Sequence, residues 1–213
     1  DRESDLESVF RYNFMSSPVT TNSEKDKYTV FSAFKDGTNA LDDNSLAGVK
    51  IARDIEFIGN WNGSPYNAEH DYPSLKISNR WIHTFAPNEG KKSNWLRTGA
   101  WGAIKATDGF IFKGPGIKQN YTFAGSPNDG ELKTNVGAGQ TYLIGNPFSS
   151  AMNALKFIKD NLSTIEGTLH LWDHVGSDNS SEFSGHYAGG YMGGYATVNL
   201  TMGTTPLEYS FDP

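Results

Sequence analysis

Short runs of alternating aromatic and β-branched residues recur along the chain roughly every ten residues, with turn-forming residues between them. Alternation with a period of two is typical of a strand that turns one face to a core and the other to solvent. The 23 glycines suit many short strands joined by tight turns. We expect strands at residues 28–34, 54–58, 75–85, 100–106, 109–112, 120–124, 131–136, 141–144, 167–172 and 195–201.

Two of the turns between these strands indicate hairpins. Thr107-Asp108-Gly109 and Asn128-Asp129-Gly130 each lie between two expected strands. Asp-Gly turns between alternating segments are typical of β-hairpins. The pattern therefore predicts a mainly β fold, an antiparallel β-sandwich or jelly-roll-like domain.

One segment has helical spacing instead. Met152, Leu155 and Ile158 recur three residues apart, with Lys156 between the last two and Lys159 directly after them. Two serines precede this segment, and either could cap a helix by accepting a hydrogen bond from its first turn. We expect one short helix at about residues 149–160.

The length of the chain and the absence of a linker bear on domain organisation. The chain has 213 residues, enough for one sizeable β domain with its own core. Only 37% of the residues are hydrophobic, but aromatic residues make up 13% and each buries a large area. No low-complexity linker divides the sequence. We expect a single β-rich domain over residues 1–213 that is a segment of a longer protein.

Charge and hydropathy argue against two kinds of partner. The formal net charge is −6, and no run of Lys or Arg is longer than Lys91–Lys92. Because a nucleic-acid-binding surface needs a basic stripe, we expect no nucleic-acid partner. No apolar run approaches the roughly 20 residues needed to span a bilayer, so we expect no membrane insertion.

Cysteine is absent, which excludes thiol chemistry. Eukaryotic secreted domains of this kind often carry disulfides. A cysteine-free, β-rich chain with much Asn, Gly and Thr is more typical of an exported bacterial surface protein. A cytosolic protein could have the same composition.

The sequence signatures of catalysis are missing. The chain has no Gly-x-Ser-x-Gly, no His-Glu-x-x-His and no phosphate-binding loop ending in Gly-Lys-Ser/Thr. Glu56, Glu69 and Asp71 could supply the paired carboxylates of a polysaccharide-acting hydrolase, which is one alternative function. Acids in a polar loop have the same pattern, and we expect a non-catalytic protein.

A second alternative is a carbohydrate-binding module. Flat aromatic rings can stack on the apolar faces of sugars, and of the five tryptophans we expect Trp61 and Trp95 to lie exposed in polar loops. The ligand-binding candidates are therefore Trp61, Asn62, Tyr66 and Trp95. The competing interpretation is that such rings fill or cover the core, as most do.

Calcium is the one cofactor that the sequence indicates. The segment 173–182 is rich in carboxylates, amides and hydroxyls, the oxygen ligands that Ca²⁺ prefers. Its candidate ligands are Asp173, Asp178, Asn179 and Glu182. The spacing does not fit an EF-hand, and turn residues alone could explain it.

Histidines in the same region could suggest another metal site. If residues 167–172 form a strand, His170 and Trp172 share one face and Leu169 and Leu171 share the other. The alternation leaves His174 beyond the end of that strand. We interpret these histidines as ordinary surface residues.

Several segments resemble, in order, a domain of large Bacteroidota surface proteins. Tyr12-Asn-Phe-Met-Ser-Ser-Pro-Val19 is similar to the Tyr-x-Tyr-Trp-Ser-Ser-Pro-Val opening of that domain, with Phe14-Met15 in place of Tyr-Trp. The further similar segments are Gly109 to Pro115, Phe123 to Gly130, Tyr142 to Ala151, Gly167 to His174 and Gly194 to Thr197. Each motif is short, but together they follow in order and span nearly the whole chain.

The resemblance implies a cellular location and no chemistry. Such domains belong to adhesin-like or gliding-associated proteins that the type IX secretion system exports. It implies an extracellular, cell-surface location, with other domains of the same chain and the secretion machinery as partners. The carbohydrate-binding alternative adds surface glycans to these partners. We therefore expect a non-catalytic structural or adhesive module.

Overall fold

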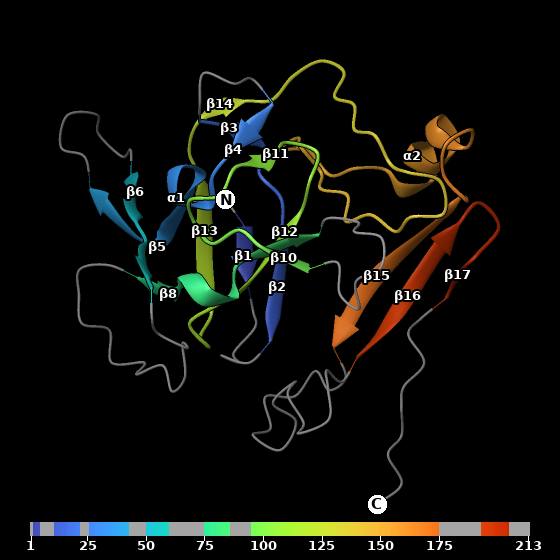
Figure 1. The fold of residues 1–213 in the computed structure, drawn as a ribbon. Helices are drawn as coiled ribbons and strands as arrows, with labels where there is room; N and C mark the ends of the chain where they lie inside the picture. Colours follow the sequence, from blue (N-terminus) through green and yellow to red (C-terminus); the bar gives the residue numbers. More distant parts are fainter. Residues whose placement is uncertain are drawn as a thin grey trace, which may run out of the picture. The chain divides into compact units, whose positions relative to one another are not determined.

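A computed structural model describes residues 2–4, 11–21, 26–42, 50–59, 75–85, 95–174 and 193–204 (Figure 1). The chain separates into two compact units, Asp1–Ser149 and Ser150–Pro213. We describe each unit by itself, and the single domain over residues 1–213 stays a prediction. The described residues are mainly β, in several antiparallel sheets, which confirms the predicted sandwich-like class.

The first unit holds most of the strands. Its early elements are β1 (Arg2–Ser4), β2 (Tyr12–Met15), β3 (Val19–Thr20), β4 (Lys27–Tyr28), α1 (Val30–Ala33), β5 (Phe34–Asp42), β6 (Lys50–Asp54) and β7 (Glu56–Ile58). Its later elements are β8 (Lys76–Ser78), a 3₁₀ turn (Asn79–Trp81), β9 (His83–Phe85), β10 (Trp95–Arg97), β11 (Ile104–Lys105), β12 (Phe110–Lys113), β13 (Gln119–Phe123) and β14 (Ser126–Pro127).

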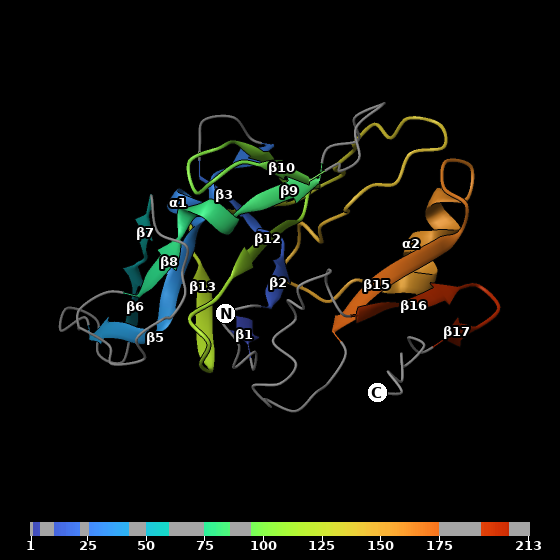
Figure 2. The same cartoon turned by 60° about the horizontal axis from the view of Figure 1, so that its bottom comes forward.

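Two four-stranded antiparallel sheets dominate this unit, in the orders β1-β13-β5-β6 and β10-β9-β12-β2. Figure 2 shows β9 beside β10, and β5 near β13. Short antiparallel pairs join β11 to β4 and β14 to β3. β7 and β8 pair in parallel, the one such pair in the part of the chain that the structure describes.

Aromatic side chains from both sheets form the core between them. Phe34 of β5 stacks on Tyr121 of β13, with ring centroids 4.6 Å apart. Its edges meet Phe110 and Phe112 of β12, at 5.7 and 5.1 Å. All four rings are fully or almost fully buried. Burying each one stabilises the fold by roughly 1.5–3 kcal/mol, so four rings can hold two sheets together.

The structure divides the strand expected at residues 28–34. A single helical turn, α1, separates β4 from β5, because the side chain of Thr29 caps it by accepting a hydrogen bond from the backbone N–H of Ser32 at 3.1 Å. Val30 and Ala33, three residues apart, are both buried. A capped turn therefore overrides the β propensity of this segment.

Neither expected hairpin forms. β12 pairs with β2 and β9, not with the segment before its turn. β13 pairs with β1 and β5, and residues 131–136 form no strand. The first segment contains a turn at residues 106–107 and the second only a bend at Gly130, and burial of Phe110 and Tyr121 against distant strands decides the pairing.

The second unit contains α2 (Ala154–Asn161), β15 (Thr168–His174), β16 (Gly193–Asn199) and β17 (Gly203–Thr204). The three strands form one antiparallel sheet, and α2 packs against β15 and β16 (Figure 2). β15 and β16 confirm the strands expected at residues 167–172 and 195–201, but β15 extends to His174, which was expected to lie beyond its end. No helix among the described residues has the length and apolar character to span a bilayer.

The expected helix exists but begins later than predicted. Asn153, and neither serine at positions 149 and 150, is its N-cap, and its side chain accepts a hydrogen bond from the backbone N–H of Lys156 at 2.9 Å. Asn is as good a cap as Ser, so sequence alone could not choose between them. Of the three apolar positions used for the prediction, only Ile158 is buried.

Candidate functional site

Of the predicted sugar-binding residues, Trp95 is the one that the structure describes. It lies on β10, an edge strand, and 38% of its surface is exposed. Trp61, Asn62 and Tyr66 lie outside the described residues. The exposure predicted for Trp95 is therefore found, while its role in binding stays a prediction.

Trp95 belongs to an aromatic group on one face of its sheet. Its ring packs edge-on against Phe85 of β9 and Phe14 of β2, with centroids 5.2 and 6.4 Å away. Phe14 is itself 41% exposed. Because β10 and β2 are the two edges of the sheet, the two rings reach toward each other over its outer face. Between them Ile111 is almost fully buried.

The charges on the same face are positive. The strand register places Arg97 opposite His83 and His83 opposite Ile111, so all three share the face of Trp95. Lys113, further along, lies 4.1 Å from the ring centre of Trp81. Burial lowers the pKa of His83, and the nearby charges of Arg97 and Lys113 lower it further. We call Phe14, His83, Phe85, Trp95 and Arg97 the Trp95 face.

A second exposed aromatic group lies at α1. Phe31 and Trp101 are 47% and 54% exposed, with ring centroids 5.8 Å apart and planes 31° from parallel. Phe57 is buried beside both of them, with its ring centroid 6.4 Å from each. We call this pair of exposed rings the Phe31–Trp101 platform. A buried third ring restricts how far either exposed ring can move.

The backbone under the platform is tied together. The N–H of Phe31 donates to the carbonyl of Ala100 at 2.8 Å, which joins α1 to the turn that carries Trp101. The N–H of Ala100 donates to Oδ1 of Asn79 at 2.5 Å. Gly99, which starts this turn, has φ of +60°, a conformation that favours glycine. The two rings are thus presented by fixed backbone, which lowers the entropy cost of binding.

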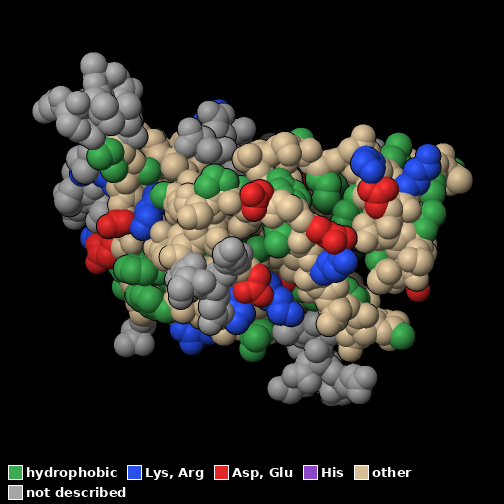
Figure 3. Space-filling model, turned by 90° about the horizontal axis from the view of Figure 1, so that it is seen from above, with side chains coloured by type: hydrophobic (Ala, Val, Ile, Leu, Met, Phe, Trp, Pro, Cys, Tyr) green, Lys and Arg blue, Asp and Glu red, His purple; other side chains and the backbone are tan. Residues whose placement is uncertain are grey.

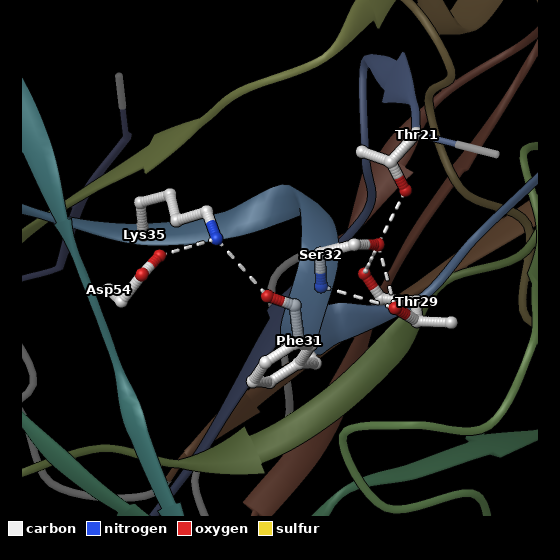
Figure 4. A network of polar contacts seen from close by, with 6 residues as sticks. All are labelled: Thr21, Thr29, Phe31, Ser32, Lys35 and Asp54. Atoms are coloured by element: carbon white, nitrogen blue, oxygen red, sulfur yellow. Dashed lines mark hydrogen bonds and ion pairs between the residues drawn. The ribbon is translucent and has the colours of Figure 1, made fainter.

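Polar groups adjoin the platform (Figure 4). The ammonium group of Lys35 lies 2.7 Å from Oδ1 of Asp54 and donates to the carbonyl oxygen of Phe31 at 3.3 Å. It also lies 5.8 Å from the centre of the Phe31 ring. On the other side of α1, the hydroxyl of Ser32 lies 2.5 Å from that of Thr21. Side chains on both sides therefore hold the helical turn in place.

Sequence reasoning did not select Trp101 or Phe31. Both fall within segments expected to be strands, where alternation predicts packing and says nothing about a ligand. A signal was present, because Trp101 lies between Gly99 and Gly102, a pattern that indicates a turn. Figure 3 shows hydrophobic side chains reaching the surface in separate patches among charged ones.

A third aromatic group lies in the second unit. Tyr195 is opposite Trp172 in the sheet, and their ring centroids are 5.0 Å apart. His170 packs edge-on against the same tyrosine at 6.1 Å. The predicted common face of His170 and Trp172 is thereby confirmed. Tyr195 is 55% exposed.

The structure describes one of the four predicted calcium ligands. Asp173 is an exposed residue of β15, while Asp178, Asn179 and Glu182 lie outside the described residues. Within the ranges that the structure describes, no three His, Asp or Glu side chains gather where they could hold a metal ion. The loop 173–182 as a calcium site stays a prediction.

The structure describes one of the three acids considered for hydrolysis. Glu56 is an exposed residue at the start of β7. Glu69 and Asp71 lie outside the described residues. The carboxylate pair of a hydrolase therefore stays a prediction.

Several motifs noted in the sequence meet at one place in the first unit. The hydroxyl of Ser16 donates to the carbonyl oxygen of Asn146 at 2.9 Å. The side-chain amide of Asn128 donates to the carbonyl oxygen of Pro147 at 2.9 Å. Tyr142 donates its hydroxyl proton to the carboxylate of Asp108. We call this meeting point the motif junction, and its contacts are those of a scaffold.

Titration at the motif junction agrees with a structural role. Burial raises the pKa of Tyr142 to about 12, and its hydrogen bond to Asp108 contributes. Burial also raises the pKa of Tyr28, whose hydroxyl donates to the carbonyl oxygen of Asp108 at 3.1 Å. Both phenols stay protonated at neutral pH and serve as donors.

The described part of the chain is thus a mainly β protein with half-exposed aromatic groups on rigid supports. The chain belongs to a family described as a domain of unknown function (DUF8693), whose model matches residues 60–211. No curated protein shows significant similarity to it, and no solved structure does.

Proposed function

We propose that the chain is a non-catalytic adhesive module of a secreted bacterial cell-surface protein, and that it holds glycans through the Phe31–Trp101 platform. The observation that carries this proposal is the exposure of two adjacent aromatic rings on a rigid support. Contiguous exposed apolar side chains mark interaction sites, whereas single exposed apolar side chains are ordinary on a protein surface. The fixed backbone and the buried ring of Phe57 keep the platform ready for a ligand.

A glycan fits the chemistry of this platform. Pyranose rings have an apolar C–H face that stacks on aromatic rings, and hydroxyl groups around the edge that need donors and acceptors. Lys35 supplies a donor and Asp54 an acceptor beside the ring of Phe31. Because the two charges are paired, the platform favours an uncharged sugar over an acidic or basic one.

The same residues favour binding without hydrolysis. Hydrolysis of a glycosidic bond needs two carboxyl groups, one on each side of the bond. Among the described contacts beside the platform, the one carboxylate is that of Asp54, and it is paired with Lys35. This arrangement supports retention of the glycan unchanged.

The motif series supports the cellular setting. Its resemblance to Bacteroidota surface domains supports export by the type IX secretion system and a role in adhesion or gliding. The motif junction, built from three of those motifs, supports a scaffold that carries the binding residues. Other domains of the same chain and the secretion machinery are the remaining partners in this proposal.

Binding to neutral oligosaccharides tests the platform. A panel of neutral hexose and pentose oligomers is titrated by calorimetry against the wild type, Phe31→Ala and Trp101→Ala. We expect each substitution to weaken binding at least tenfold, about 1.4 kcal/mol. Tyr195→Ala removes an equally exposed ring elsewhere and should leave affinity unchanged. Wild-type-like binding by Phe31→Ala and Trp101→Ala, or no neutral ligand at all, would reject the platform.

The location has a separate test. Protease shaving of intact native cells, followed by mass spectrometry, asks whether peptides of this chain are released from the surface. Release together with peptides of a longer polypeptide supports the surface module. Recovery only from the soluble interior of lysed cells would reject it.

A further inference from the structure

The edge strand β10 combines a stacking ring and a cation on one face. Trp95 and Arg97 are two residues apart, so their side chains leave the strand on the same side, roughly 7 Å apart. Both are exposed. The ring of Trp95 is held from two sides by Phe85 and Phe14. An aromatic surface and a guanidinium group are thus displayed together in a fixed order.

The charge of this face is opposite to that of the whole chain. The formal net charge is −6, yet the charges that act on His83 at the centre of the face come from Arg97 and Lys113. The side chains that the register places on this face are aromatic, apolar or basic. A local positive field on an acidic protein attracts an acidic ligand and repels a basic one.

We propose that the Trp95 face binds an acidic glycan, a polysaccharide whose sugar rings carry carboxylates. The ring of Trp95 stacks on the apolar face of a uronate residue, and the guanidinium of Arg97 pairs with a carboxylate. A planar guanidinium donates two parallel hydrogen bonds to a carboxylate, which a neutral sugar cannot accept in that form. The proposal rests on the proposed function for the ligand being a glycan, and it assigns a second site of different charge preference.

Aromatic rings and cations also bind single-stranded nucleic acid, but this face favours the glycan. Binding of single-stranded nucleic acid needs a positively charged groove that follows a backbone with one phosphate per nucleotide. Arg97 is one exposed cation, on a chain of net charge −6. A uronate chain needs fewer cations on the protein, because one paired carboxylate and one stacked sugar ring already define its orientation.

Oligogalacturonate of uniform length is the probe, and its fully methyl-esterified form is the matched ligand control. The ester keeps the sugar ring and removes the charge. We expect the wild type to bind the acid form at least tenfold more tightly than the ester, with affinity falling as salt rises. Equal affinity for the two forms, or no binding of the acid form, would overturn the proposal.

Arg97→Gln tests the residue, because it removes the charge from an exposed position and keeps most of the side chain. We expect it to abolish the preference for the acid form, and Trp95→Ala to weaken both forms. Arg97→Lys, which keeps the charge but not the planar fork, should fall between. Lys105→Gln removes an exposed charge from β11, in another sheet, and should bind as the wild type does. Unchanged acid preference in Arg97→Gln would refute the assignment.

Two further measurements distinguish the Trp95 face from the Phe31–Trp101 platform and from a nucleic-acid surface. Trp101→Ala should leave binding of oligogalacturonate unchanged. The acidic-glycan site on the Trp95 face is therefore tested independently of the neutral-glycan site on the platform. An oligothymidylate that binds more tightly than oligogalacturonate, with the same dependence on Arg97, would identify a nucleic-acid surface and overturn the proposal. Circular dichroism and thermal melting of each variant check that the fold is intact.

Discussion

Phe34 and Tyr121 stack with ring centroids 4.6 Å apart and planes 22° from parallel, in the middle of the aromatic core. They lie on neighbouring strands, β5 and β13, while Phe110 and Phe112 meet Phe34 from the facing sheet. Phe34 therefore contacts both layers of the first unit. Its position follows directly after the capped turn α1, which also displays Phe31.

Removing the Phe34 ring should destabilise the protein strongly. Phe34→Ala deletes contacts with four rings, because Phe123 also lies within 5.2 Å, and leaves a cavity between the sheets. Such substitutions cost about 3–5 kcal/mol of the free energy of unfolding. Phe31→Ala, three residues earlier and half-exposed, should cost well under half of that. Urea denaturation measures both, and equal losses would show that the core is not organised around Phe34.

A glycine at the motif junction, Gly145, should be irreplaceable because of its surroundings. It is not among the glycines with positive φ, so its backbone conformation does not require glycine. Instead, a Cβ on it would lie 2.7 Å from Cβ of Ser16 and 2.8 Å from the carbonyl of Asp108. The backbones at this junction approach too closely for any side chain.

Gly145→Ala should therefore lower the free energy of unfolding by about 1–3 kcal/mol, the usual cost of overpacking. Gly59→Ala is the matched control, because a Cβ there meets no atom of the described residues within 4 Å. Thermal melting monitored by near-ultraviolet circular dichroism compares the two. A Gly145→Ala variant as stable as Gly59→Ala would mean that the junction can open without cost.

Tyr142 should make stability depend on alkaline pH. Its pKa is raised from 10.0 in the unfolded chain to about 12 in the fold, because of burial and its hydrogen bond to Asp108. The folded state therefore keeps a proton that the unfolded state loses between these values. The resulting stability is fully present below pH 10 and is lost as the pH rises toward 12.

Tyr142→Phe isolates this contribution. At neutral pH the variant should be less stable by about 1.5–3 kcal/mol, because the Asp108 carboxylate loses a donor. The difference from the wild type should shrink between pH 10 and 12, as the wild type loses its advantage. Denaturation curves across that range give the difference directly. A constant difference would contradict the assigned titration.

The sequence by itself determined the features that depend on local patterns. Alternation sufficed for the mainly β class, for the strands around Leu169 and Val198, and for the common face of His170 and Trp172. Helical spacing placed α2 to within a few residues. These features depend on neighbours two to four positions away, which a sequence displays directly.

Only the tertiary structure decided which strands pair and which aromatic residues are exposed. The turn at Asp129-Gly130 predicted a hairpin, yet Tyr121 is buried against strands far away in the chain. The sequence predicted that Trp101 lies in a strand. It lies instead in a turn that the hydrogen bond from the N–H of Phe31 to the carbonyl of Ala100 holds beside α1, and its half-exposed ring lies next to that of Phe31. Alternation predicts which residues share a face of a strand. Packing against strands distant in the sequence decides whether that face is buried or exposed.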